Sequence, residues 1–443
     1  MTVELSGHYG YRRIVKAMTP MVLMMLVTSV YSIVDGLFIS NYAGSDAFAG
    51  MNLVWPAIAL VGALGLMIGS GGSALVSKTF GEGDPEKANR IFSMLVRLTI
   101  VAGIAIAVLM FVFMPRVVLW LGADDALMKP AVTYGRILVS IMPFFMLQMA
   151  FQPFFMVAEK PDLGTAMSIA SGVTNILLDA LFVAVLGWGL PGAAVSSAIA
   201  LSLGGVYPLL YFSSGRNRTH LRMVRCGFDW RSVAKSCSNG LSEFVGNIAL
   251  NIITICYNWQ LMRIIGADGV SAYGIVMYIG FIFGAVFIGY NMGISQVISY
   301  NFGAANNAEL RSLLRKSLVI IGIVGVMMTT VAELGAPLVA RIFVGYDETL
   351  SDVTCHATRI YMLSFLICGF NMFVSAWFTA LNNGVVSAIA AFGRTLVFEL
   401  ASVFILPMLW GLDGVWVSVN VAETLALVLS LILMLAYRRR YGY

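Results

Sequence analysis

Long apolar runs separated by short polar segments dominate this chain. Twelve runs can be delimited, and each approaches or exceeds the roughly 20 residues that an α-helix needs to cross a bilayer. They cover about residues 14–39, 51–76, 91–114, 131–157, 163–186, 192–212, 237–264, 270–300, 313–334, 353–381, 385–410 and 415–437. The runs do not show the short alternating pattern of transmembrane β-strands. The pattern predicts an all-α polytopic membrane protein with twelve transmembrane helices.

The composition agrees with this pattern. Of the 443 residues, 59% are hydrophobic and 11% are charged, whereas a soluble domain usually carries about 25% charged residues. The five cysteines show no paired spacing, so neither a disulfide framework nor a zinc site is expected. The first apolar run is too long for a removable signal peptide and lacks a small-residue cleavage site, so we expect it to remain as a membrane helix.

The basic residues alternate from loop to loop. Twelve spans place both termini on one side, and the loops of that side hold roughly 20 of the 27 Lys and Arg residues. The opposite loops hold about six, namely Arg116, Lys129, Arg136, Arg263, Arg341 and Arg359. Because Lys- and Arg-rich loops stay in the cytoplasm, we expect a multi-pass protein of the bacterial cytoplasmic (inner) membrane with both termini cytoplasmic. The net charge of +5 then reports orientation in the lipid bilayer, and no nucleic-acid partner is expected.

An internal repeat relates the two halves of the chain. Three landmarks recur at the same offset of 222 residues: Gly44 and Gly266, Phe80-Gly81 and Phe302-Gly303, and Gly192–Val195 and Gly414–Val417. Each repeat holds six spans, an even number, so both repeats have the same topology. The repeat predicts an N-terminal lobe (1–212), a basic cytoplasmic linker (213–236) and a C-terminal lobe (237–443). They should be related by a pseudo-two-fold axis along the membrane normal, with a central cleft between the lobes.

Several polar residues lie inside the spans of the N-terminal lobe. Asn175 and Asp179 are four residues apart, so they share one face of a helix. At about 1.5 Å per helical residue, Asp35, Asp179 and Ser197 each lie roughly 9–12 Å below the outer surface. Ionisable groups at such depth are costly and generally functional. Asn175 and Ser197 have an equally good explanation as ordinary interhelical hydrogen-bonding residues.

These four residues suit an ion site if they converge. Two carboxylates with amide and hydroxyl oxygens can bind Na⁺, and they can equally exchange a proton, because burial and a nearby like charge favour a protonated carboxyl group. The positions 222 residues further on are Tyr257, Val397, Ala401 and Val419, none of them acidic. The fold therefore does not require carboxylates at these places, and the predicted site belongs to the N-terminal lobe alone.

The C-terminal lobe has acids of its own, Glu243, Glu399 and Glu423, and Arg394 precedes Glu399 by five residues, which allows an ion pair. Spans four and ten are crowded with methionine and aromatic residues, most of which should serve packing. The remainder can line a cleft that accepts varied apolar cations by dispersion and cation–π contact. The candidates for the substrate cleft are Met146, Met149, Phe154, Glu243, Phe370, Trp377 and Glu399.

Enzyme signals are weak. The three histidines, His8, His220 and His356, fall in or near loops, and the sequence contains neither a phosphate-binding glycine-rich loop nor a Walker-type lysine. We therefore expect neither an enzyme nor an ATP-driven pump, and no cofactor other than a coupling ion.

The chain resembles the MATE (multidrug and toxic compound extrusion) transporters, in particular their bacterial MepA-like branch. The resemblance covers nearly the whole chain. It rests on Pro20 and Asp35, the glycine-rich stretch from Ser70 to Gly81, the Asn175-xxx-Asp179 pair, Pro191–Ser197, Asn239–Phe244 and Ile298–Gly303. The family implies a V-shaped fold of twelve helices, of the MOP type. It implies a coupling site at Asp35, Asn175, Asp179 and a span-six hydroxyl, here Ser197 where relatives often have Thr. Relatives of the NorM type carry an acid further along span seven, and Glu243 does not match that place.

The resemblance implies a monomeric secondary transporter that expels organic cations or amphipathic drugs in exchange for H⁺ or Na⁺. A lipid-linked precursor flippase of the same superfamily is the alternative. A phosphate-bearing substrate would require a cationic cleft, and only Arg394 lies deep in a span. An intramembrane enzyme or a scaffold is a third class, but it lacks a nucleophile–base pair and leaves the acids of the N-terminal lobe unexplained.

Overall fold

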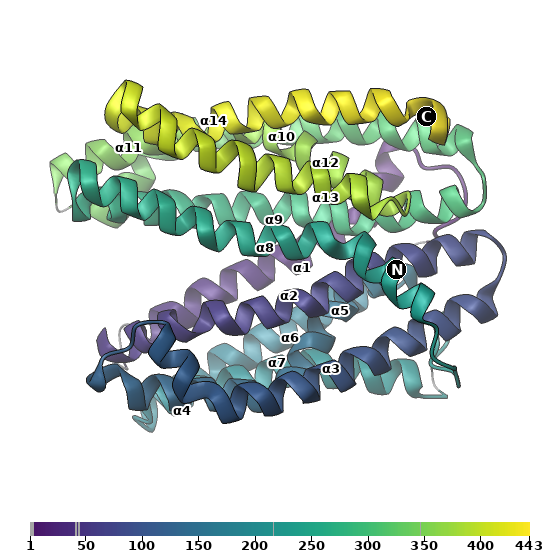
Figure 1. The fold of residues 1–443 in the computed structure, drawn as a ribbon, viewed down its shortest axis with the longest axis horizontal. Helices are drawn as coiled ribbons and strands as arrows, with labels where there is room; N and C mark the ends of the chain where they lie inside the picture. The colour runs from purple at the N-terminus through teal and green to yellow at the C-terminus, as the bar shows by residue number, and fades with distance from the viewer. Residues whose placement is uncertain (1–3, 40–41, 43–44, 216, 346) are drawn as a thin grey trace.

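The computed structural model describes residues 4–39, 42, 45–215, 217–345 and 347–443, and Gly44, one landmark of the repeat, lies outside these ranges. Long helices that run along one common direction make up the molecule (Figure 1). The helices of the first half are α1 (Tyr11–Phe38), α2 (Ser45–Gly81), α3 (Pro85–Trp120), α4 (Asp125–Ser140), α5 (Met142–Val157), α6 (Pro161–Asp179), the π-helix η2 (Ala180–Val185) and α7 (Gly189–Ser213). The helices of the second half are α8 (Trp230–Ile265), α9 (Ala267–Gly303), α10 (Asn307–Val344), α11 (Glu348–Met362), α12 (Phe365–Ala380), α13 (Gly384–Phe392), the π-helix η3 (Gly393–Glu399) and α14 (Leu400–Tyr441).

The helices confirm the twelve predicted spans once three interruptions are recognised. Nine helices of the described residues are long and apolar enough to cross a membrane, and two further spans are bent pairs, α4 with α5 at 59° and α11 with α12 at 45°. The last stretch, Gly384–Tyr441, has 58 residues, and as one straight helix it would reach ~87 Å, far beyond a hydrocarbon core of roughly 30 Å. Its backbone breaks at Gly411 (φ 58°, ψ −130°), which divides it into the eleventh and twelfth spans.

Several helices begin earlier than the apolar runs because a polar residue caps the first turn. The side chain of Asp84 accepts a hydrogen bond from Lys87 N (3.0 Å) at the start of α3. Asn306 caps α10 in the same way through Glu309 N (3.2 Å). Asp229 caps α8, and the hydroxyl of Ser232, at 2.6 Å from its carboxylate, holds the pKa of Asp229 below its ordinary value. These caps satisfy main-chain N–H groups that have no partner within the helix.

The two halves of the chain lie on opposite sides of the molecule. In Figure 1, helices α2–α7 fill the lower part and α8–α14 the upper part, with α1 between them. Helix α1 packs on both α6 and α9, and α2 packs on α5, α8 and α9. The end that carries residues 4–10, the segment 213–230 and the C-terminus is called the basic end below, because the Lys- and Arg-rich loops are gathered there. The halves approach each other toward this end (Figure 1).

Main-chain contacts join the halves near the basic end. A Cβ atom on Gly81 of α2 would lie 2.0 Å from the main-chain oxygen of Tyr300, and one on Gly303 of α9 would lie 2.0 Å from that of Lys78. No residue with a side chain fits such an approach. Gly81 and Gly303 are the central landmark of the predicted repeat, so this landmark marks a pseudo-symmetric crossing of α2 and α9. Close to it, Ser77 Oγ donates to Gln296 O (2.7 Å) and Ser299 Oγ donates to Ala74 O (2.5 Å).

The halves separate away from the basic end. The hydrogen bonds that connect the two halves, among the residues that the structure describes, involve only residues toward the basic end. Further along α8 and α9, Cβ atoms added at Gly246, Gly274, Gly280 and Gly284 would meet no atom within 4 Å. The molecule is therefore closed at the basic end and open toward the opposite end, as expected of a V-shaped body.

Candidate functional site

The structure brings together the four polar residues singled out in the first half. Asp35 lies near the end of α1, Asn175 and Asp179 lie in the last turns of α6, and Ser197 lies two turns into α7. These positions are all in the half of the molecule remote from the basic end. Helix α1 packs against α6, so Asp35 comes from the helix adjacent to Asn175 and Asp179, within range of electrostatic interaction with both.

Hydroxyl groups of α7 complete this cluster. Asn175 Nδ2 donates to Ser197 Oγ at 3.4 Å. Ser196 Oγ donates a hydrogen bond to Asp179 Oδ1, a contact that sequence reasoning missed. Both serines are buried, so burial alone could not have told which of two adjacent hydroxyls meets the carboxylate. Tyr134 of α4 was also missed; its buried ring lies within electrostatic range of both aspartates.

The cluster holds more acceptor oxygens than donors. Asp179 is 0% exposed and Asn175 is 1% exposed. Three buried oxygens have no hydrogen-bond partner among the described residues: Asp35 Oδ1, Asn175 Oδ1 and Asp179 Oδ2. Unpartnered buried acceptors are costly, and two adjacent carboxylates repel unless a proton or a cation lies between them. The donor set consists of hard oxygen atoms, the ligand type that alkali and alkaline-earth cations prefer over nitrogen or sulfur.

A local change of helix type follows the acid of α6. The α-helical pattern ends at Asp179, and the next six residues, Ala180–Val185, form the π-helix η2. π-Helical turns are rare and occur frequently at functional sites. The wider turn begins directly after Asp179, so it sets the direction in which the chain leaves the cluster.

The second half contains a different arrangement of charges. Arg394 Nη2 and Nε both lie 2.7 Å from Glu423 Oε1, so Arg394 pairs with Glu423 and not with Glu399, the pair that the sequence spacing allowed. Asn371 Nδ2 donates to the other carboxylate oxygen of Glu423 at 2.7 Å, and Ser430 Oγ donates to Asn371 Oδ1 at 2.9 Å. The sequence distance of 29 residues between Arg394 and Glu423 hid this contact, which depends on how α14 packs beside η3.

The predicted cleft residues fall into two groups. Met146, Phe154 and Trp377 are at most 1% exposed and lie inside the packed cores of this conformation. Met149, Phe370, Glu243 and Glu399 are only partly buried and are the members with surface available to a ligand. The cleft assignment stays a prediction for all seven.

Comparison with protein families gives an assignment for the whole architecture. The profile of the MatE family matches two segments, residues 20–181 and 244–405. The chain belongs to the MatE family. The two matched segments of this MatE chain begin 224 residues apart, close to the 222-residue offset of the sequence landmarks, and they fall within the first and second predicted lobes. Members of the family are membrane transporters, so this MatE protein is a transporter and not an enzyme.

Curated relatives and solved structures agree with this assignment. The chain is 24% identical over 422 residues to "Multidrug export protein MepA" of Staphylococcus haemolyticus, covering 95% of this chain and 92% of that protein. It is 22% identical to the protein of the same name from Staphylococcus aureus, with the same coverage. A solved structure described as an outward-facing conformation of a multidrug resistance MATE family transporter matches with a TM-score of 0.91 at 21% identity, covering 99% of this chain and 97% of that one. A second, of a MATE protein in complex with MaL6, matches with a TM-score of 0.92 at 21% identity and the same coverage.

The buried ion pair in the second half of this MatE protein gives a stability prediction. Replacing Glu423 with leucine leaves the Arg394 guanidinium, whose side chain is 24% exposed, without its partner. Removing one member of a buried pair costs about 3 kcal/mol or more. We expect a clear drop in the midpoint of thermal unfolding of the detergent-solubilised protein. The matched control is Glu333→Leu, because Glu333 lies 3.9 Å from Arg359 and both side chains are partly exposed. Equal midpoints for the two variants would show that the Arg394–Glu423 pair does not stabilise the fold.

Proposed function

We propose that this protein exports organic cations or amphipathic drugs from the cytoplasm in exchange for H⁺ or Na⁺. It would act as a monomer in the bacterial cytoplasmic membrane, with the basic end in the cytoplasm. The observation that carries the proposal is that α1 and α6 pack together where Asp35 and Asp179 lie, and that one buried oxygen each of Asp35, Asn175 and Asp179 has no hydrogen-bond donor among the described residues. A proton or Na⁺ bound there would satisfy these oxygens and remove the repulsion between the two carboxylates.

The nature of the exported molecule is supported by two features. The curated relatives named above are multidrug export proteins, and the match with this chain covers nearly their full length. The partly buried candidates Met149, Phe370 and Glu399 offer a flexible thioether, a flat ring and a carboxylate. This combination suits a bulky apolar cation, which gains dispersion, cation–π contact and charge pairing. The cargo class and the cleft residues are therefore part of the proposal.

Exchange follows if the ion and the drug favour different arrangements of the lobes. The arrangement described here is closed at the basic end, so it is the one that releases cargo to the outside. Ion binding at Asp35 and Asp179 would shift the equilibrium toward the arrangement in which the basic end opens and cargo enters. A ligand shifts such an equilibrium only by its difference in affinity for the two states, so the acid cluster must change its geometry between them.

The structure does not support the flippase alternative. A phosphate-bearing lipid precursor would require free cationic side chains in the cleft, and the one deep cation identified from the sequence, Arg394, is neutralised by Glu423.

Gradient-driven transport in proteoliposomes tests the proposal. With purified protein, ethidium movement should follow an imposed H⁺ gradient or an imposed Na⁺ gradient, applied separately, and should stop when an ionophore dissipates the effective gradient. An Asp413→Asn variant is the control, because Asp413 is an exposed acid that pairs with His356 and lies outside the cluster. Ethidium movement that responds to neither gradient would refute ion-coupled export.

A further inference from the structure

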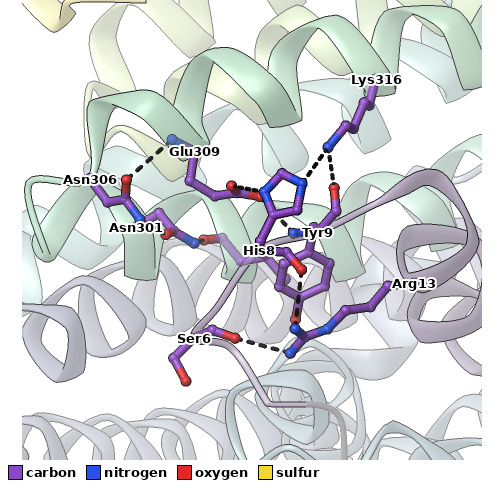
Figure 2. Close-up of polar contacts among 9 residues, drawn as sticks. Ser6, His8, Tyr9, Arg13, Asn301, Asn306, Glu309 and Lys316 are labelled. Carbon is purple, nitrogen blue, oxygen red and sulfur yellow. Dashed lines mark hydrogen bonds and ion pairs between the residues drawn. The ribbon is translucent and has the colours of Figure 1, made fainter.

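The segment that precedes α1 binds to a helix of the opposite half. Figure 2 shows the contacts with α10: Tyr9 N donates to Glu309 Oε1 at 2.8 Å, and His8 Nδ1 lies 2.7 Å from Glu309 Oε2. Lys316 Nζ, two turns further along α10, donates to Tyr9 O at 2.5 Å and lies 3.4 Å from His8 Nε2. Residues 4–10 are called the strap below.

The other end of the strap is held by the first half. Leu5 N donates to Glu159 Oε1 at 2.8 Å, in the turn between α5 and α6. The guanidinium of Arg13 in α1 donates to the main-chain oxygens of Ser6 at 3.0 Å and His8 at 3.1 Å (Figure 2). The side chains of Leu5 and Tyr9 are 1% and 0% exposed, so they pack into the protein. The strap therefore crosses from one half to the other at the basic end.

Glu309 provides a buried carboxylate in the contact between α10 and the strap. Its side chain is 7% exposed although it lies in the first turn of the helix. Each of its carboxylate oxygens accepts one hydrogen bond, and both donors, Tyr9 N and His8 Nδ1, belong to the strap. If the halves part at the basic end, this carboxylate must exchange both partners for water. Hydrogen bonds to a charged group are stronger than neutral ones, so the contact resists that movement.

The segment that enters the second half makes the pseudo-symmetric contact. Arg222 N donates to Asn89 Oδ1 and Val224 N donates to Ser93 Oγ, each at 2.8 Å, so the segment ahead of α8 lies along α3. The strap ahead of α1 lies in the same way along α10, the helix related to α3 by the repeat. Each half is thus entered through a peptide that docks on the third helix of the other half. The segment ahead of α8 is the covalent connection between the halves, whereas the strap is not, so the strap can leave α10 while that connection stays intact.

We propose that the strap is a latch that holds the basic end closed, with Glu309 as the positioning residue that fastens it to α10. The proposal rests on the alternating-access function proposed above, because a latch has a role only if the basic end opens during transport. Release of the His8–Glu309–Lys316 contact then accompanies the step that admits cargo. The latch sets the ratio of closed to open molecules without contacting cargo or the coupling ion.

Distances between spin labels test the latch directly. Labels at Lys87→Cys in α3 and Arg315→Cys in α10, two exposed positions near the basic end, report the separation of the halves by double electron–electron resonance. The background lacks the five native cysteines. Glu309→Ala should raise the ratio of open to closed molecules about 10-fold, since it removes charge-assisted hydrogen bonds from the closed state. Glu309→Asp should restore part of the closed population, and His8→Ala, which removes one contact from an exposed side chain, should give a smaller shift in the same direction.

A matched acid provides the control. Glu86 lies in the first turn of α3 as Glu309 does in α10, but its side chain is 82% exposed and, among the residues that the structure describes, pairs only with Arg90. Glu86→Gln should leave the distance distribution unchanged. If Glu309→Ala and His8→Ala also leave it unchanged, the latch is refuted. The distances are measured without cargo and without an ion gradient, so their result is independent of the proposed function, which the gradient experiments on ethidium test separately.

Discussion

Asp35→Asn and Asp179→Asn variants should each reduce gradient-driven ethidium export to the level of protein-free liposomes, while the protein remains folded. Each substitution keeps the size of the side chain and removes a charge from the contact between α1 and α6. The remaining carboxylate then has no like charge beside it. Its affinity for a proton or Na⁺ falls, because a neighbouring negative charge favours binding of a cation. Thermal stability should hold or rise, because the repulsion between two buried acids is removed.

Two further substitutions sharpen this expectation. Ser196→Ala removes the hydroxyl that donates to Asp179 and should reduce export less severely, since the charge pair persists. Asp125→Asn alters an exposed acid in the same half, at the start of α4, and should leave export intact. Normal gradient-driven export by Asp35→Asn would remove Asp35 from the mechanism.

Gly303→Ala and Gly81→Ala should each abolish export by preventing closure of the basic end. A methyl group at either position would lie 2.0 Å from a main-chain oxygen of the facing helix. A carbon and an oxygen that do not bond normally stay more than 3 Å apart, so α2 and α9 would have to separate by about 1 Å or more. The variants should therefore accumulate with the basic end open and should release no cargo to the outside.

A glycine on the same helix provides the control for this prediction. Gly280 of α9 has no atom within 4 Å of an added Cβ, so Gly280→Ala should export normally. Export rates in proteoliposomes, together with the spin-label distances at the basic end, distinguish the two cases. Undiminished export by Gly303→Ala with an unchanged closed distance would show that the crossing tolerates a side chain and is not a required seal.

The spans and the repeat could be predicted from the sequence because both depend on local properties. A bilayer demands long apolar runs whatever the helices contact, so the run lengths alone located twelve spans. The Phe-Gly landmark was found as a recurrence, and the structure adds its cause, the crossing of α2 and α9 at Gly81 and Gly303. The bends of 59° and 45° in the fourth and tenth spans were not predicted. Such bends depend on which helices pack against the span, and this is not a local property.

In the candidate site, too, some features could be predicted from local sequence properties and others depend on how the helices pack. Asp35 and Asp179 could be singled out because they are acids inside apolar runs, and the structure places them on the adjacent helices α1 and α6. Their depth in the bilayer and their role in coupling stay predictions. The choice between Ser196 and Ser197 depends on the rotation of α7 against α6, which a buried helix without a polar face does not reveal. The partner of Arg394 depended in the same way on a contact between distant segments. The docking of residues 4–10 on α10 was also missed, because a short polar segment before a first membrane helix carries no periodic signal.

Ion binding to the purified protein tests the acid cluster most directly. Binding of radioactive ²²Na⁺ and the release or uptake of protons are measured on detergent-solubilised protein, with Asp179→Asn as the variant and Asp125→Asn as the control. The wild type should give at least one of these signals at one ion per molecule, the control should match it, and the folded Asp179→Asn protein should give neither. Undiminished ion binding by Asp179→Asn would contradict the assignment of the coupling ion to the Asp35–Asn175–Asp179 cluster.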